Sequence, residues 1–260
     1  MPLLNKAPIA SPIGLLAESA KGPRLTRREW LLAATLLLVG GPVVRGRATA
    51  ASNAAGLPIV DRADPLKFFR PDEARFIDAA ISRLIPDDAL GPGANEAGVA
   101  VFIDHQLAGP FGQASDWYMA GPWADGAKQQ GYQCRRTPAE VYRAAIGGID
   151  DHVRQASGNT FAMLAGSEQD RLLHALAEDK IDLGDVSAST FFTLLWQNTQ
   201  EGFFADPIYF GNRGFAGWKL VGYPGPRYNY DGAIRHFGER YPLPTVGLMG
   251  RDPSKRPSSL

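Results

Sequence analysis

The chain has 260 residues, of which 45% are hydrophobic and 21% charged, a composition ordinary for a soluble globular protein. Its 27 basic and 27 acidic residues balance, but seven basic ones lie in the first fifty residues, so the remainder is mildly acidic, with 20 basic against 25 acidic residues. That balance excludes the dense basic surface of a nucleic-acid-binding protein. Cys134 is the only cysteine, which excludes an internal disulfide, a CxxCH haem site and a thiolate cluster. We interpret it as a small apolar group rather than a nucleophile.

The first fifty residues have the features of an export signal. Residues 26–31 (TRREWL) contain Arg27 and Arg28, an apolar run follows at 31–39, and residues 48–50 (ATA) offer a cleavage site. The pattern resembles a bacterial twin-arginine signal, and its apolar run is shorter than the roughly 20 residues that span a bilayer. We therefore expect a signal peptide at 1–50, cleaved after Ala50, a flexible lead-in at 51–67, and a periplasmic protein.

Five stretches of the remaining chain have the apolar spacing of helices. The first begins at Pro71 and ends at Pro86, a capping box, Thr137 with Glu140, begins the third, and Ser167 is predicted to cap the fourth. The expected helices lie at about 71–85, 95–107, 137–153, 167–176 and 187–205. The sequence therefore predicts a mainly α, irregular helical domain of about five helices at 68–241. Long glycine- and aromatic-rich loops join the helices, and a Pro-rich tail follows at 242–260.

The loop at 86–95 contains oxygen ligands suited to a metal ion. Asp87, Asp88 and Asn95 lack the regular spacing of a calcium loop, so we favour a turn in which Asn95 caps the second helix. On that helix His105 falls off the apolar stripe, and we expect it to be solvated.

No catalytic motif stands out among the remaining polar residues. Residues 150–152 (DDH) are consecutive on a helix, point in different directions and are expected on a solvated face. The strongest catalytic hypothesis pairs Glu201 or Asp206 with His236, and we disfavour it because no recognised motif supports it. We therefore predict no catalytic, cofactor-binding or metal site in this chain.

Residues 109–136 are irregular, with Trp117, Tyr118, Trp123 and Tyr132 among glycines and prolines. Three interpretations remain open: a carbohydrate-stacking platform, a contact segment for a partner protein, or a long loop lying on its own core.

Residues 201–225 (EGFFADPIYFGNRGFAGWKLVGYPG) combine seven aromatic residues with six glycines. Glycines allow positive φ and close backbone approach, and aromatics supply large contact areas, so we expect an ordered irregular loop that lies against another surface. The fifth helix is expected to enter this loop, with Phe192, Leu195, Trp196, Thr199 and Phe203 along one face.

The run at 190–225 closely resembles the hallmark of the gluconate 2-dehydrogenase subunit 3 family. Residues 85–104 also resemble the family's N-terminal half, so the resemblance covers 68–225. Phe210 departs from the pattern, since a second glycine is common at its position. The matching hallmark positions are Thr199, Glu201, Gly202, Phe203, Phe204, Asp206, Pro207, Tyr209, Gly211, Asn212, Gly217, Trp218, Gly222, Tyr223, Pro224 and Gly225.

This resemblance implies a non-catalytic accessory subunit of a membrane-associated dehydrogenase that oxidises sugars or sugar acids. It implies a large subunit of the glucose-methanol-choline (GMC) type that holds FAD, sometimes with an iron–sulfur cluster. It also implies a multihaem cytochrome c subunit, whose haem c groups pass electrons to quinone. The small subunit is expected to support export and maturation of the large one, and the complex to associate with the membrane.

The same loop is the natural place for docking a large subunit, because interface centres are rich in aromatic residues. The candidate interface residues are Phe204, Asp206, Tyr209, Asn212, Trp218, Tyr223 and Pro224. The alternative is a free periplasmic sugar-binding protein that uses Trp117, Trp123 and Trp218.

Overall fold

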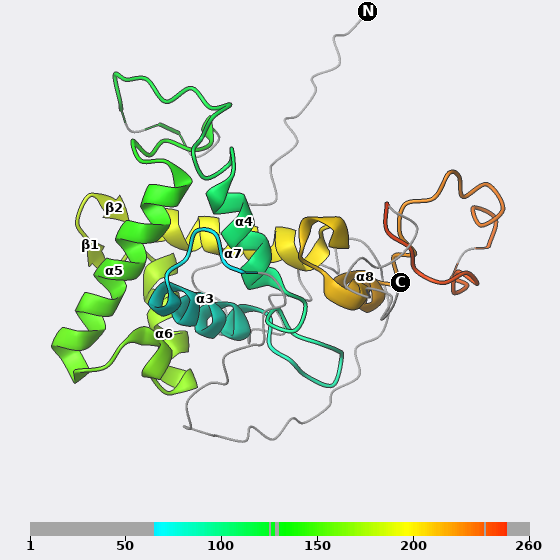
Figure 1. The fold of residues 1–260 in the computed structure, drawn as a ribbon, viewed down its shortest axis with the longest axis horizontal. Coiled ribbons are helices and arrows are strands. Elements are labelled where there is room, and N and C mark those ends of the chain that lie inside the picture. The colour runs from blue at the N-terminus through cyan, green and yellow to red at the C-terminus, as the bar shows by residue number, and fades with distance from the viewer. Residues whose placement is uncertain (1–64, 125, 128–129, 237, 249–260) are drawn as a thin grey trace, which may run out of the picture. The chain divides into compact units, whose positions relative to one another are not determined.

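The structure is a computed structural model that describes residues 65–124, 126–127, 130–236 and 238–248. Within these ranges the chain contains α-helices α3 to α8, short 3-10 helices and one two-stranded sheet (Figure 1). The predicted mainly α fold is therefore confirmed. The expected signal at 1–50, with Arg27 and Arg28, lies outside the described residues. None of the helices in the described part is long and apolar enough to cross a bilayer.

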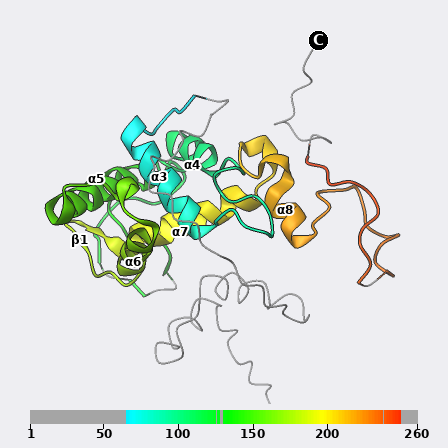
Figure 2. The same ribbon diagram turned by 90° about the horizontal axis from the view of Figure 1, so that it is seen from below.

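Helix α7 (Ala188–Phe204) is the element on which the others pack (Figure 1, Figure 2). It begins where expected, because the hydroxyl of Ser187 caps it by accepting the N–H of Thr190. The helices that contact it are α3 (Pro71–Leu84), α4 (Val99–Ala108), α5 (Pro138–Ser157), α6 (Gly166–Ala177) and α8 (Ala216–Val221).

The buried face of α7 differs from the expected stripe. Phe192 and Trp196 are only half-buried, whereas Leu195, Thr199 and Phe203 are buried as expected. Because other helices pack on several sides of α7, its buried face is broader than the predicted stripe and includes residues outside that stripe. The additional buried residues are Ala188, Phe191, Leu194, Asn198 and Gly202.

Four aromatic rings form the centre of the core. The ring of Phe76 lies 4.6 Å from that of Phe161 and 6.2 Å from that of Phe191, which in turn lies 5.3 Å from the ring of Tyr142. The Tyr142 hydroxyl donates to Oδ1 of Asn198 at 2.9 Å, so the polar atom is satisfied inside the core. Burial raises the pKa of Tyr142 well above its usual value. These contacts join α3, α5 and α7.

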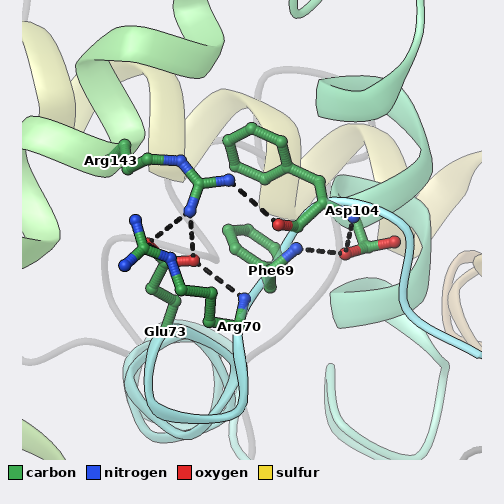
Figure 3. A network of polar contacts seen from close by, with 6 residues as sticks. Phe69, Arg70, Glu73, Asp104 and Arg143 are labelled. Atoms are coloured by element: carbon green, nitrogen blue, oxygen red, sulfur yellow. Dashed lines mark hydrogen bonds and ion pairs between the residues drawn. The ribbon is translucent and has the colours of Figure 1, made fainter.

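The start of the described chain is held on α4 by Asp104, which is fully buried (Figure 3). Its carboxylate accepts the backbone N–H groups of Lys67 at 2.6 Å, Phe68 at 3.0 Å and Phe69 at 2.8 Å. Arg143 of α5 donates to the carbonyl of Phe68 at 3.0 Å and pairs with Glu73 at 2.8 Å (Figure 3). Residues 67–69 are therefore bound to the helices before α3 begins.

Two predicted helix caps are wrong. Asn95 donates through Nδ2 to the carbonyl of Asp78 at 3.1 Å, and α4 is preceded instead by Gly98, whose φ is 76°. A turn between these two residues separates Asn95 from the helix. Helix α6 begins at Gly166 without a side-chain cap, so Ser167 lies inside the helix.

The expectation of a solvated face at residues 150–152 is wrong for Asp150, which is buried. The 3-10 helix η2 (Phe161–Met163) folds back over α5, and the N–H of Phe161 donates to Oδ1 of Asp150 at 2.9 Å. Burial raises the pKa of this carboxyl group above its usual value.

The connection between α6 and α7 contains a small hairpin. Strands β1 (Asp182–Leu183) and β2 (Val186–Ser187) pair antiparallel, with Asp182 opposite Ser187. Asp179 accepts the N–H of Ser189 and the hydroxyl of Ser187, and these bonds lower its pKa. Asp179 therefore holds the first turn of α7 next to the end of α6.

Candidate partner interface

The segment 201–225 is more regular than the expected loop. After α7 it forms the 3-10 helices η3 (Pro207–Tyr209) and η4 (Arg213–Phe215), and then α8. The carboxylate of Asp206 caps η3 by accepting the N–H of Ile208 at 3.0 Å, while Pro207 occupies the first helical position. Short elements of this kind are hard to predict because the apolar spacing covers too few residues.

Asn212 ties the two ends of this segment together. It is fully buried and adopts a left-handed backbone, with φ 48° and ψ 38°. Its Nδ2 donates to the carbonyl of Ala205 at 2.8 Å, and its Oδ1 accepts the N–H of Gly217 at 2.8 Å. Asn tolerates this backbone better than most residues. One side chain therefore connects the end of α7 to the first turn of α8.

Two glycines allow the backbone to fold back on α7. A Cβ atom at Gly211 would lie 2.1 Å from the carbonyl oxygen of Gly202, and one at Gly217 would lie 2.1 Å from that of Phe203. Both distances are far below van der Waals contact, so no larger residue fits without moving the backbone. The glycine spacing of the sequence reflects this close approach.

Phe210 departs from the family pattern at a position where the backbone conformation favours glycine. Its φ is 75°, in the left-handed region where glycine is favoured. Its ring packs edge-on against His105, with ring centroids 4.1 Å apart. The expectation that His105 is solvated is therefore wrong, because the chain folds the 3-10 turn over α4 and half-buries the imidazole.

Trp218 lies inside the segment, with 6% of its surface exposed. Its indole Nε1 donates to the carbonyl of Phe204 at 2.7 Å, its ring stacks on Phe215 at 5.4 Å, and Tyr223 contacts its edge at 5.0 Å. The indole thus satisfies a carbonyl at the end of α7. This position supports a packing role for Trp218 rather than direct contact with a partner.

The predicted interface residues divide into two groups. Asp206, Asn212 and Trp218 are buried and bonded within the segment, and Pro224 is half-buried. The other three remain accessible: Phe204 is 39%, Tyr209 51% and Tyr223 41% exposed. The buried residues hold the accessible ones in place.

Four more apolar side chains are exposed on or next to the same elements, and none of them was among the predicted interface residues. Only the adjacent apolar pair Leu220 and Val221 offered a signal in the sequence. The seven accessible residues, here called the exposed apolar set, are Phe204, Ile208, Tyr209, Phe210, Leu220, Val221 and Tyr223.

The disfavoured catalytic hypothesis gains no support from the contacts of its residues. Glu201 accepts from the amides of Gln197 at 2.9 Å and Asn198 at 3.0 Å, whereas His236 faces Glu239 with Nδ1 to Oε2 at 3.3 Å. Asp206 binds backbone N–H groups. In the described ranges no three acidic, histidine or cysteine side chains are grouped to hold a metal ion.

The polar cleft between the start of α3 and α5 is a separate feature. It has a volume of about 210 Å³ and is lined by side chains of both signs, among them Arg70, Glu73, Arg143, Asp150 and Arg154. Arg143 pairs there with Glu73 at 2.8 Å. The cleft is a mixed-charge crevice in which charged groups already face opposite charges.

The aromatic residues of 109–136 partly pack on one another. Trp117 contacts Phe111 at 5.7 Å and Tyr132 at 4.9 Å, and burial raises the pKa of Tyr132. Tyr118 is 85% exposed. Burial of Trp218 removes one of the three tryptophans on which the sugar-binding alternative depends.

Comparison with known protein families gives a match over the helical region. The family described as gluconate 2-dehydrogenase subunit 3 matches residues 71–225, which begin with α3 and end just after the segment held by Asn212 and Trp218. Comparisons with curated proteins and with solved structures find no match. The matched region covers more than half of the chain and includes all of the helices described above, so the chain belongs to the gluconate 2-dehydrogenase subunit 3 family, a family of subunits of a dehydrogenase complex.

Proposed function

We propose that this protein is the non-catalytic small subunit of a periplasmic flavoprotein dehydrogenase complex that oxidises a sugar or sugar acid. In this proposal its partners are a GMC-type large subunit that holds FAD and a multihaem cytochrome c subunit. The chain travels through the twin-arginine pathway and takes the large subunit with it. The complex then associates with the inner membrane.

The observation that carries this proposal is the exposed apolar set on a fixed scaffold. Its seven side chains are 38% to 51% exposed, and all come from the end of α7, from η3 and its cap, or from α8 and the two residues that follow it. Soluble monomers rarely expose large apolar patches unless these patches bind something, and aromatic residues are enriched at interface centres. Family membership supplies the expected partner, because the family is that of a dehydrogenase subunit.

The scaffold matters because a preorganised surface loses less entropy when it binds. Asn212 bonds to both helices, and Trp218 bonds to the end of α7, so the backbone under the exposed apolar set is fixed before docking. Tyr209 and Tyr223 bring rigid rings with few rotatable bonds, which limits the ordering cost further.

Export of the complex is the second part of the proposal. The twin-arginine pathway carries folded cargo, often because a cofactor is inserted in the cytoplasm. A large subunit that has bound FAD and lacks its own signal could then be exported only in association with the small subunit. The segment with Arg27 and Arg28 at the start of the chain would supply that signal.

The test is purification of the tagged full chain from its native host. We expect a flavin-containing dehydrogenase subunit to co-purify, recognised by its absorption spectrum and peptide masses. The double variant Arg27→Lys with Arg28→Lys should leave both subunits in the cytoplasm. Recovery of the small subunit alone would overturn the docking proposal, and normal export of the large subunit in the double variant would overturn the shared-export proposal.

A further inference from the structure

The chain leaves the helices after Gly225 and returns to the same place some twenty residues later. The N–H of Val246 donates to the carbonyl of Pro224 at 3.2 Å, and the N–H of Leu248 donates to Oδ2 of Asp206 at 2.7 Å. A Cβ atom at Gly225 would lie 1.7 Å from the carbonyl oxygen of Val246, so glycine is required for this approach. Figure 1 and Figure 2 both show the intervening loop projecting beside α8.

Residues 226–245, here called the arm, have contacts of their own. The guanidinium of Arg227 lies 5.1 Å from the ring centroid of Tyr241 and donates to the carbonyl of Pro244. The rings of Tyr230 and Tyr241 meet at 5.6 Å, and the Tyr230 hydroxyl donates to the carbonyl of Gly225. These contacts join the outgoing leg of the arm to the returning leg. None of the arm's described residues belongs to the hydrophobic core.

Apolar side chains of the arm point to solvent. Tyr228 is fully exposed, Ile234 is 60% exposed and Leu243 is 53% exposed. Ordered loops longer than about 12–15 residues without regular structure are uncommon and are usually functional. The family match ends at Gly225, so the arm follows directly after the matched region.

We propose that the arm is a second docking element, which contacts the flavoprotein large subunit alongside the exposed apolar set. This inference rests on the proposed function. The base of the arm adjoins the exposed apolar set, because Asp206 both caps η3 and binds Leu248. The legs are already joined, so the arm meets its partner with a reduced ordering cost.

The charges of the arm favour a protein surface over a lipid surface. Binding to anionic membranes depends on clusters of basic residues. The arm instead mixes signs, and its arginine, aspartate and glutamate residues are Arg227, Asp231, Arg235, Glu239 and Arg240. Exposed aromatic and aliphatic groups among charges of both signs are typical of a protein interface with a polar rim.

The experiment removes the arm from the full chain in its native host. One variant replaces residues 227–244 with a short glycine linker. A short linker can join the two ends of the arm because they lie close together, with Val246 hydrogen-bonded to Pro224. A second variant, Tyr228→Ser with Ile234→Ser, keeps the backbone of the arm. The matched control is Leu90→Ser with Met163→Ser, since both residues are 69% exposed and lie outside the arm and the exposed apolar set.

We expect both arm variants to retain the wild-type melting temperature and to bind the co-purified flavoprotein subunit about tenfold more weakly, which corresponds to 1.4 kcal/mol. The control should bind normally. If the linker variant does not fold, the double serine variant decides the question.

Three results would overturn the role of the arm. The first is wild-type recovery of the flavoprotein by the double serine variant. The second is arm-dependent binding to anionic lipid vesicles with unchanged binding to the flavoprotein, and the third is arm-dependent self-association of the small subunit alone. Failure of the wild-type chain to bring down any flavoprotein would instead overturn the proposed function itself, and the arm's role with it.

Discussion

Replacing Asn212 with alanine tests whether one buried amide holds the segment 205–225 on the end of α7. The substitution removes the bond from Nδ2 to the carbonyl of Ala205 and the bond from Oδ1 to the N–H of Gly217. Both backbone groups then lose their partners in a site where the Asn212 side chain has no exposed surface.

The expected loss can be worked out from these contacts. A buried polar group left without a partner costs about 1–3 kcal/mol, so two such groups cost about 2–6 kcal/mol. Alanine at φ 48° adds left-handed strain of roughly 1 kcal/mol. We expect a loss of about 4 kcal/mol in the free energy of unfolding, a large share of the usual total of about 5–15 kcal/mol.

The assay is urea unfolding followed by near-ultraviolet circular dichroism, which reports the packing of Trp218 against Phe215. Asn212→Gly also loses both bonds but relieves the strain, so it should be more stable than Asn212→Ala by about 1 kcal/mol. Asn229→Ala, at an exposed position, is the control and should change little. A loss below about 1 kcal/mol together with an unchanged dichroism signal would refute the bracing role of Asn212.

Three further substitutions probe the other conclusions. Asp104→Asn should weaken the hold on residues 67–69, so trypsin should cleave after Lys67 several times faster, and an unchanged cleavage rate would contradict this. Because burial raises the pKa of Asp150 in the folded state, its contribution to stability falls as pH rises above the usual value of 3.8. Asp150→Asn should therefore flatten the stability profile at pH values just above 3.8, and a profile parallel to wild type would exclude this cause. Trp218→Ala should lower the free energy of unfolding by about 3–5 kcal/mol. A melting temperature close to wild type, together with lost co-purification of the flavoprotein subunit, would instead assign Trp218 to the partner interface.

The sequence by itself determined the helical class of the protein and most helix boundaries. Pro71 begins α3, Thr137 and Glu140 form the capping box of α5, and α7 begins at Ala188, next to the predicted start at 187. These signals are local, because a cap or a proline acts on residues within one turn of itself. The hallmark residues at 199–225 also identified the family from the sequence, and the family match confirms it.

Only the tertiary structure decided which residues are buried where segments distant in the sequence meet. Asp150 is buried by η2, and His105 is half-covered by Phe210. Trp218 turns inward because the carbonyl of Phe204 offers its indole a partner. A tryptophan buried beneath a surface and one exposed on it cannot be told apart in the sequence, since the difference depends on contacts with another element. The same reason explains why the return of the chain to Asp206 at Leu248 could not be predicted, because a hydrogen bond that spans 42 residues leaves no local pattern.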